Sequence, residues 1–293
     1  QAGFLDELRA LLAAHPNVPR GYLELEVLES SALEDIALVS AVIDASATLG
    51  VSFALDDFGT GYSSLTYLKR LPAQVLKIDQ SFVRDMLQDS DDLAILEGIL
   101  GLATAFRRRA IAEGVETVAH GETLLRLGCD LGQGYGIARP MAAADLPAWR
   151  QRWRPDPRWA HAHCLDRELI PVLIAGVEHR GWIVALGEHL DGRRDAPPPL
   201  DHHQCRFGQW LDKTIHQPRH AATFATIETL HLRVHALAAD LLKRRSQGHD
   251  VEALAGMAEL HALWDALLVH LEYLLKDDPR SLAPSSGGGS NCR

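Results

Sequence analysis

The stretch that decides the fold is VSFALDDFGTGYSSL, residues 51–65. Residues 51–55 are rich in apolar side chains, which predicts a buried strand that ends at Asp56 and Asp57. The glycines behind the two acids predict a tight turn. Neighbouring carboxylates repel each other unless a cation lies between them, and Mg²⁺ or Mn²⁺ binds such oxygens while leaving room for a phosphate. The pair therefore favours a metal site; the alternative is an Asp-rich turn or helix cap, the commoner use of Asp before glycine.

Other polar candidates recur where further predicted strands end. We expect strands near residues 22–27, 51–57, 75–78, 110–113 and 130–133, and helices near 33–49, 63–71, 91–107 and 118–127. Glu26, Lys77, Glu113 and Gln133 fall on or next to these strands. This distribution is typical of a (β/α) barrel, whose chemistry lies on the loops at the carboxyl ends of its strands. Such a barrel needs about eight strands, so the α/β part is expected to be a partial TIM-like barrel with its first strands missing.

Five motifs occur in a fixed order: ELEVLES (24–30), DDFGTGYSSL (56–65), LKID (76–79), AEGVET (112–117) and QGY (133–135). In this order they resemble the EAL-domain phosphodiesterases, which hydrolyse cyclic di-GMP. The resemblance covers about residues 1–150, the predicted first domain. It implies a two-metal site for Mg²⁺ or Mn²⁺.

The resemblance also implies roles for single residues. Glu26, Asp56 and Asp57 would be metal ligands, and Glu113 would be a metal-side carboxylate that acts as the base for the attacking water. Lys77 would contact that water or a phosphate oxygen, where a fixed cation stabilises developing charge. Supporting positions would be Glu29, beside the DDFG loop, with Glu116 and Gln133.

Two functions are left open by this part of the sequence. The Glu-Ala-Leu signature of the family and a metal-binding Asn belong upstream of the residues present, so the chain resembles the C-terminal part of a longer protein. The first hypothesis is hydrolysis of cyclic di-GMP to linear pGpG, regulated by zinc or an oxidant through the second domain. The alternative is a catalytically inactive module that binds cyclic di-GMP or senses zinc, favoured by the missing ligands and an altered segment behind Tyr135. A homodimer is implied by the resemblance alone.

Composition limits the partners. The formal net charge of −10 and the pI of about 5.8 argue against binding of DNA or RNA polymers. No apolar run approaches the roughly 18 residues of a membrane span, so no span is expected and a cytoplasmic location is predicted. Four scattered cysteines do not suggest a disulfide framework.

Histidine is distributed unevenly, because thirteen of the fifteen follow residue 160. This shift predicts a domain boundary, with a linker at residues 151–165, an all-α helical bundle at 166–276 and a disordered tail at 277–293. Within the bundle, helices are expected at about 166–190, 221–245 and 251–275.

The helical part carries a candidate zinc site. His231 and His235 are four residues apart and share one helix face, although two such histidines often simply face water. With His179 and Cys205 they make a set of four ligands that suits tetrahedral Zn²⁺ better than Mg²⁺. The pattern resembles the chemoreceptor zinc-binding (CZB) domains over about residues 166–275. A closed four-ligand site would be regulatory rather than catalytic; a purely structural zinc-stabilised bundle is the other reading of this part.

Six further histidines of this part have no place in the pattern. Surface positions or positions next to the ligands are expected for them: His202, His203, His216, His220, His261 and His270.

Overall fold

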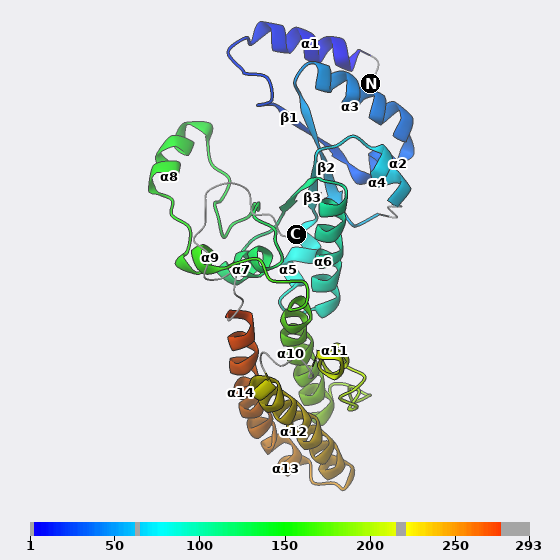
Figure 1. The fold of residues 1–293 in the computed structure, drawn as a ribbon, viewed down its shortest axis with the longest axis vertical. Coiled ribbons are helices and arrows are strands. Elements are labelled where there is room, and N and C mark those ends of the chain that lie inside the picture. The colour runs from blue at the N-terminus through cyan, green and yellow to red at the C-terminus, as the bar shows by residue number, and fades with distance from the viewer. Residues whose placement is uncertain (1–2, 62–64, 215–220, 277–293) are drawn as a thin grey trace. The chain divides into compact units, whose positions relative to one another are not determined.

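The computed structural model describes residues 3–61, 65–214 and 221–276. The described residues form two compact units: the first joins residues 3–85 with 94–162, and the second joins residues 86–93 with 163–276, apart from the gaps given above. Figure 1 labels the elements of both. The predicted tail, His216 and His220, and the end of the DDFG motif at residues 62–64 lie outside the described residues.

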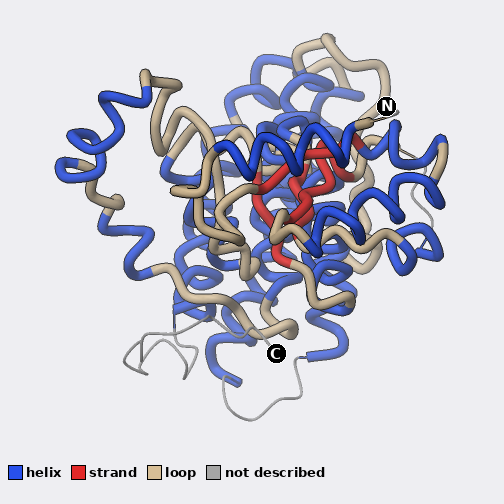
Figure 2. The backbone as a smooth tube through the Cα atoms, turned by 90° about the horizontal axis from the view of Figure 1, so that it is seen from above, coloured by secondary structure: helices blue, strands red, loops and turns tan. Residues whose placement is uncertain are grey.

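The first unit is built on an open parallel sheet. Its strands are β1 (Glu24–Leu28), β2 (Ser52–Phe58), β3 (Val75–Ile78) and β4 (Arg109–Ala112), hydrogen-bonded in that order. They appear in red in Figure 2. The order does not reverse as it does in a doubly wound sheet, so chain neighbours are also spatial neighbours, as in a barrel. The strand predicted at 130–133 was wrong: this segment forms only an isolated parallel bridge between Gly132 and Ala112. Among the described residues the sheet is therefore not closed into a barrel.

Helices connect the strands of this unit. They are α1 (Phe4–Ala14), α2 (Glu29–Glu34), α3 (Ile36–Thr48), α4 (Leu65–Arg70), α5 (Gln80–Asp85), α6 (Ser90–Ala105), α7 (Val118–Arg126), the 3₁₀ turn η1 (Ala143–Asp145), α8 (Leu146–Arg152) and α9 (Pro157–His161). The helix predicted at 33–49 is confirmed as α3, but it begins only at Ile36, because the chain leaves the helical conformation at Asp35, between α2 and α3. The Asp35 carboxylate accepts a hydrogen bond from the Leu38 amide and so caps the start of α3. Helix α9 lies within the predicted linker, and the sequence did not predict α1, α5 or α8.

The core of the first unit lies around the two central strands. All four residues of β3 are buried, Lys77 included, as are Phe53, Ala54 and Leu55 of β2. Strand β1 alternates between exposed and half-buried positions, since it pairs on one side only. Two well-buried strands therefore carry polar side chains of the candidate site.

The second unit is all-α. Its helices are α10 (Ile170–Leu190), α11 (Arg206–Thr214), α12 (Ala221–Ser246), α13 (Asp250–Ala255) and α14 (Met257–Lys276). Helices α10, α12 and α14 share a core of aliphatic side chains with Phe207 and Trp264. The single last helix predicted at 251–275 was wrong. It breaks at Gly256, where α12 comes so close that a Cβ would lie 2.3 Å from a methyl group of Leu241.

Helix α10 resembles a membrane span in its length and composition. Among the described helices it is the one long and apolar enough to cross a bilayer. Its apolar residues, among them Ala175, Ile183 and Leu186, are buried in the core of the helical unit, and His179 lies in its middle. We therefore interpret α10 as a core helix.

Candidate functional site

Carboxylates from three neighbouring strands converge on one lysine. The Nζ atom of Lys77 lies 2.8 Å from Glu26, 2.7 Å from Asp56 and 2.6 Å from Glu113. Oxygen atoms of Asp56, Asp57 and Glu113 lie within 4.8 Å of one another. Because parallel strands end at a common edge, residues far apart in the sequence meet there. The structure thus brings together the strand-end acids that the motifs singled out.

A bulge in β2 lets two consecutive acids join this cluster. Leu55 pairs with Leu76, and Phe58 pairs with Ile78, so β2 has one more residue than β3 over this interval. Asp57 has a φ of 54°, in the left-handed region that non-glycine residues seldom adopt. Side chains alternate between the two faces of a regular strand, and a bulge interrupts this alternation. The irregularity therefore explains how Asp56 and Asp57 both face Glu113.

Lys77 is a buried cation held by acids. The residue is only 5% exposed. Burial by itself would lower the pKa of Lys77, but the hydrogen bonds to Asp56, Glu113 and Glu26 outweigh burial and raise it. An unpaired ammonium in this position would be costly, so the lysine and the acids stabilise each other.

Negative charge at the cluster exceeds the charge of Lys77. Burial raises the pKa of Asp57, and the neighbouring charges of Asp56 and Asp79 raise it further. Burial also raises the pKa of Glu113 against the opposing effect of Lys77. A set of carboxylate oxygens with excess negative charge is the donor chemistry that Mg²⁺ and Mn²⁺ require. The residues present therefore fit a divalent cation.

Asp79 belongs to this cluster, although the sequence analysis did not include it among the site residues. It lies directly behind β3, and its carboxylate accepts hydrogen bonds from the Ser81 amide at 2.9 Å and the Ser81 hydroxyl at 2.5 Å. The signal available in the sequence was its place at the end of the LKID motif, where a strand gives way to a helix.

The three residues predicted to support the site lie in different surroundings. The Gln133 side-chain amide donates to Glu113 at 2.7 Å and so orients that carboxylate. Glu116 is exposed, and its amide donates to His120 Nδ1 at 3.3 Å. Glu29 is buried under the glycine-rich turn, where its carboxylate accepts the Gly59 amide at 2.9 Å. Burial raises the pKa of Glu29, and the amides of Gly59 and Gly61 offset part of that rise.

Replacing Glu29 with Ala is expected to lower the free energy of unfolding of the first unit by about 1–3 kcal/mol, because a buried amide of the turn loses its acceptor. Urea unfolding followed by circular dichroism measures this. Glu34→Ala, an exposed acid on the same helix, is the matched control. Equal losses in the two variants would contradict the role of Glu29 in holding the turn.

The helical unit brings together the second predicted set. Ligand atoms of His179, Cys205, His231 and His235 lie within 4.8 Å of one another. The Nε2 atoms of His179 and His231 are 3.1 Å apart, and Cys205 Sγ is 3.4 Å from His231 Nε2. Two nitrogens bound to one tetrahedral zinc at about 2.0–2.1 Å would be roughly 3.3 Å apart. The spacing therefore matches the edges of a zinc tetrahedron.

Backbone carbonyls orient two of the imidazoles. His179 Nδ1 donates to Ala175 O at 3.1 Å, and His235 Nδ1 donates to Leu200 O at 2.8 Å. Both rings must then be unprotonated at Nε2 when neutral, which leaves a lone pair there for a metal. The buried Nε2 of His235 has no hydrogen-bond partner among the described residues. A buried nitrogen without a hydrogen-bond partner is energetically costly. A bound zinc ion would interact with this nitrogen, so the residues present fit the metal.

The contacts made by the segment around Cys205 explain why its sequence is CRFGQW. The Gly208 amide donates to Cys205 Sγ at 3.2 Å, an interaction that favours a thiolate. Gly208 has to be glycine, because a Cβ there would lie 1.7 Å from the His202 carbonyl oxygen. Phe207 is fully buried against the rings of His179 and His231. The Trp210 indole, stacked on Phe207, donates to Glu168 O at 3.0 Å.

Burial keeps the metal-free ligands in their neutral forms. It lowers the pKa of His179 to about 4 and that of His231 to about 2, in each case with help from neighbouring imidazoles. Burial also lowers the pKa of His235, and it raises the pKa of Cys205 to about 11. Neutral imidazoles are the form that binds metal, whereas the thiol must lose its proton when zinc binds.

Two family models match the chain where these two clusters lie. The model of the EAL domain matches residues 1–140, and that of the chemoreceptor zinc-binding domain matches residues 179–242, a span that includes all four residues of the His/Cys set. The N-terminal part of the chain belongs to the EAL domain family and is followed by a chemoreceptor zinc-binding domain. The recognition made from the motifs is thereby confirmed.

Curated relatives match about half of the chain. The bifunctional diguanylate cyclase/cyclic di-GMP phosphodiesterase MucR of Pseudomonas aeruginosa is 46% identical over 147 residues, which are 50% of this chain and 21% of MucR. The cyclic di-GMP phosphodiesterase NbdA of the same organism is 38% identical over 156 residues, which are 53% of this chain and 20% of NbdA. The chain therefore spans about a fifth of the length of these relatives.

Solved structures also match about half of the chain. The phosphodiesterase of MucR in complex with c-di-GMP is 45% identical, with a TM-score of 0.48, over 50% of this chain and 59% of that one. The EAL domain of Mycobacterium smegmatis DcpA is 37% identical, with a TM-score of 0.49, over 53% of this chain and 69% of that one. Relatives of the EAL domain thus include proteins named as cyclic di-GMP phosphodiesterases.

Proposed function

We propose that the chain is the C-terminal part of a metal-dependent phosphodiesterase that hydrolyses cyclic di-GMP to linear pGpG. The observation that carries the proposal is the convergence of Glu26, Asp56 and Glu113 on the buried Lys77. A structural ion pair needs one acid for one lysine, whereas this cluster holds more acids than Lys77 neutralises and lies where the strands end. We further propose that the open sheet is part of a (β/α) barrel.

The proposed roles of the residues are those that the family resemblance implies, and the convergence of the side chains supports them. Glu26, Asp56 and Asp57 would hold Mg²⁺ or Mn²⁺, and such ions, when bound, supply an activated water and neutralise a phosphodiester. Glu113 would take a proton from the attacking water as the general base. Its carboxylate is oriented by Gln133 and is close enough to Lys77 for the ammonium to stabilise charge that develops on a phosphate oxygen.

The helical unit is proposed as the regulator. His179, Cys205, His231 and His235 would hold one zinc ion in a closed set of four ligands, without an open position for a substrate. Zinc binding in this unit would then alter the turnover of cyclic di-GMP by the EAL domain. A cytoplasmic location and a homodimer are part of the proposal, because cyclic di-GMP is a small intracellular signal and the dimer is implied by the family resemblance.

The test is the turnover of cyclic di-GMP in the presence of Mg²⁺ or Mn²⁺, with and without stoichiometric zinc. It is run on this chain and, in parallel, on the chain extended by whatever segment its gene encodes upstream. Formation of linear pGpG that changes with zinc supports the proposal. Binding of cyclic di-GMP without product under every metal condition would overturn the enzyme and leave a nucleotide-binding module.

A further inference from the structure

Residues 191–205 connect α10 and α11 and lie beside the residues proposed to bind zinc. We call residues 196–205 of this segment the strap. It is fixed to the helices at two points: the Trp182 indole donates to Pro199 O at 2.7 Å, and His235 Nδ1 donates to Leu200 O at 2.8 Å. Within the strap, the Cys205 thiol donates to His202 O at 3.2 Å. The strap therefore carries one proposed ligand and the carbonyl group that orients another.

The three histidines of the set are closed off from solvent. His179 and His231 are each 1% exposed, and His235 is 4% exposed. A zinc ion arrives from water with water ligands, which must be exchanged one at a time for protein ligands. None of these three imidazoles offers a first contact at the surface of the unit. Cys205, the fourth proposed ligand, is half-buried, but its thiol must lose a proton before it binds a metal. The first contact is therefore expected from a neutral side chain that reaches both solvent and the buried rings.

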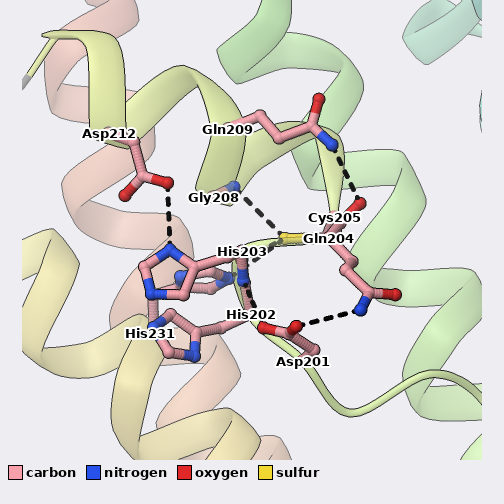
Figure 3. A network of polar contacts seen from close by, with 9 residues as sticks. All are labelled: Asp201, His202, His203, Gln204, Cys205, Gly208, Gln209, Asp212 and His231. Atoms are coloured by element: carbon pink, nitrogen blue, oxygen red, sulfur yellow. Dashed lines mark hydrogen bonds and ion pairs between the residues drawn. The ribbon is translucent and has the colours of Figure 1, made fainter.

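His202 meets this requirement. Its side chain is half-buried on the strap, and its ring centroid lies 6.1 Å from those of His231 and His235. The exposed His203 is its outer neighbour, with ring centroids 3.9 Å apart. Figure 3 shows His202 and His203 on the strap ahead of Cys205, next to His231. The imidazoles of His203, His202 and His231 thus form a series from solvent to the buried site.

The surface beside His203 is acidic. The Asp212 carboxylate of α11 lies 2.9 Å from His203 Nδ1. Asp201 on the strap accepts from the His203 amide at 3.0 Å and from the Gln204 side chain at 2.9 Å, as Figure 3 shows. Both carboxylates are exposed. Negative charge at an entrance raises the local concentration of cations.

We propose that His202 is a transfer ligand, which binds an incoming zinc ion first and passes it to His231 and His235. The inference rests on the zinc binding proposed above. It gives His202 a role in the rates of loading and release, distinct from the four ligands that hold the metal at equilibrium. His203, with Asp212 and Asp201 beside it, forms the outer part of the same path.

A transfer ligand leaves a specific kinetic signature. His202 is bound to zinc only during passage, so its removal raises the barrier between the free and the bound state without changing either end state. Loading and release must then slow by the same factor, since the ratio of the two rates is the dissociation constant. A residue that merely stabilises the site or the fold would change the dissociation constant instead.

The experiment measures both rates in the full chain. Loading of the zinc-free chain is followed by stopped-flow tryptophan fluorescence, because Trp264 stacks on His179 and Trp182 packs against His235. Release is followed by absorbance after mixing the zinc-loaded chain with excess 4-(2-pyridylazo)resorcinol. In His202→Gln both rates are expected to fall about fivefold or more, with a dissociation constant within about twofold of the original.

Two further variants sharpen the test. His202→Glu keeps a side chain that can bind zinc and is expected to retain fast loading. His261→Ala removes an exposed histidine of α14 and is expected to leave both rates unchanged. Unchanged rates in His202→Gln, or faster release with weaker affinity, would overturn the transfer role. A parent chain that takes up no zinc at equilibrium would instead overturn the proposed zinc binding itself.

Discussion

Replacing Glu113 with Gln is expected to lower the turnover of cyclic di-GMP by about 10²- to 10⁴-fold, the usual contribution of a general base. Gln has nearly the same shape as Glu, but it cannot accept a proton at neutral pH and it carries no charge. The carboxylate of Glu113 lies 2.6 Å from Lys77 and 2.7 Å from Gln133, so the substitution also leaves Lys77 with one acid fewer. Formation of linear pGpG in Mg²⁺ or Mn²⁺, resolved by chromatography, measures the effect.

The control for this experiment is Glu34→Gln, which removes an exposed carboxylate from α2 of the same unit. We expect its turnover to match that of the parent chain. Circular dichroism establishes that both variants are folded. Turnover by Glu113→Gln at the rate of the control would exclude Glu113 as the base.

Replacing His231 with Ala is expected to weaken zinc binding by more than about 100-fold, because loss of a residue that only supports a ligand already costs about 10- to 100-fold. His231 lies nearest the middle of the set, 3.1 Å from His179 and 3.4 Å from Cys205. Zinc that binds the folded state alone raises the melting temperature. We therefore expect zinc to stabilise the parent chain against heat and to have no such effect on the variant.

Scanning calorimetry with and without equimolar zinc tests this second prediction, together with zinc content after dialysis. His261→Ala again serves as the control and should keep one bound zinc per chain. His231→Gln fills more of the space left by the ring, so it separates loss of the ligand from loss of packing. Retention of zinc by both His231 variants would place the metal elsewhere.

Local patterns predicted much of this fold. The strands at 51–57 and 75–78 were recognised because buried parallel strands are continuous apolar runs ending in polar residues. The long helix from Ala221 was recognised because of its period. The break at Asp35 depends on one capping side chain, and the break at Gly256 depends on the approach of Leu241 from another helix. Neither contact is encoded in a local period, which is why both helices were predicted as continuous.

The candidate sites, too, could be predicted only in part from local patterns. His231 and His235 could be named because a four-residue spacing places two imidazoles on one helix face, and His179 and Cys205 could be added because of the resemblance to the chemoreceptor zinc-binding domains. The partners of those imidazoles could not be named, since the Leu200 carbonyl group lies 35 residues from His235. Similarly, the closeness of Asp79 to Asp57 depends on how two strands end, and Glu116, placed beside the site by its motif, has its amide on His120.

The bulge in β2 makes the number of residues between Leu55 and Phe58 as consequential as their identity. Asp56 and Asp57 are the only residues between these two, so deleting either one would restore strict alternation and would also remove one carboxylate from the cluster. Two acids can face Glu113 from this strand only because the strand carries one residue more than its neighbour. A related chain without the bulge should therefore be regarded as different in ligand count.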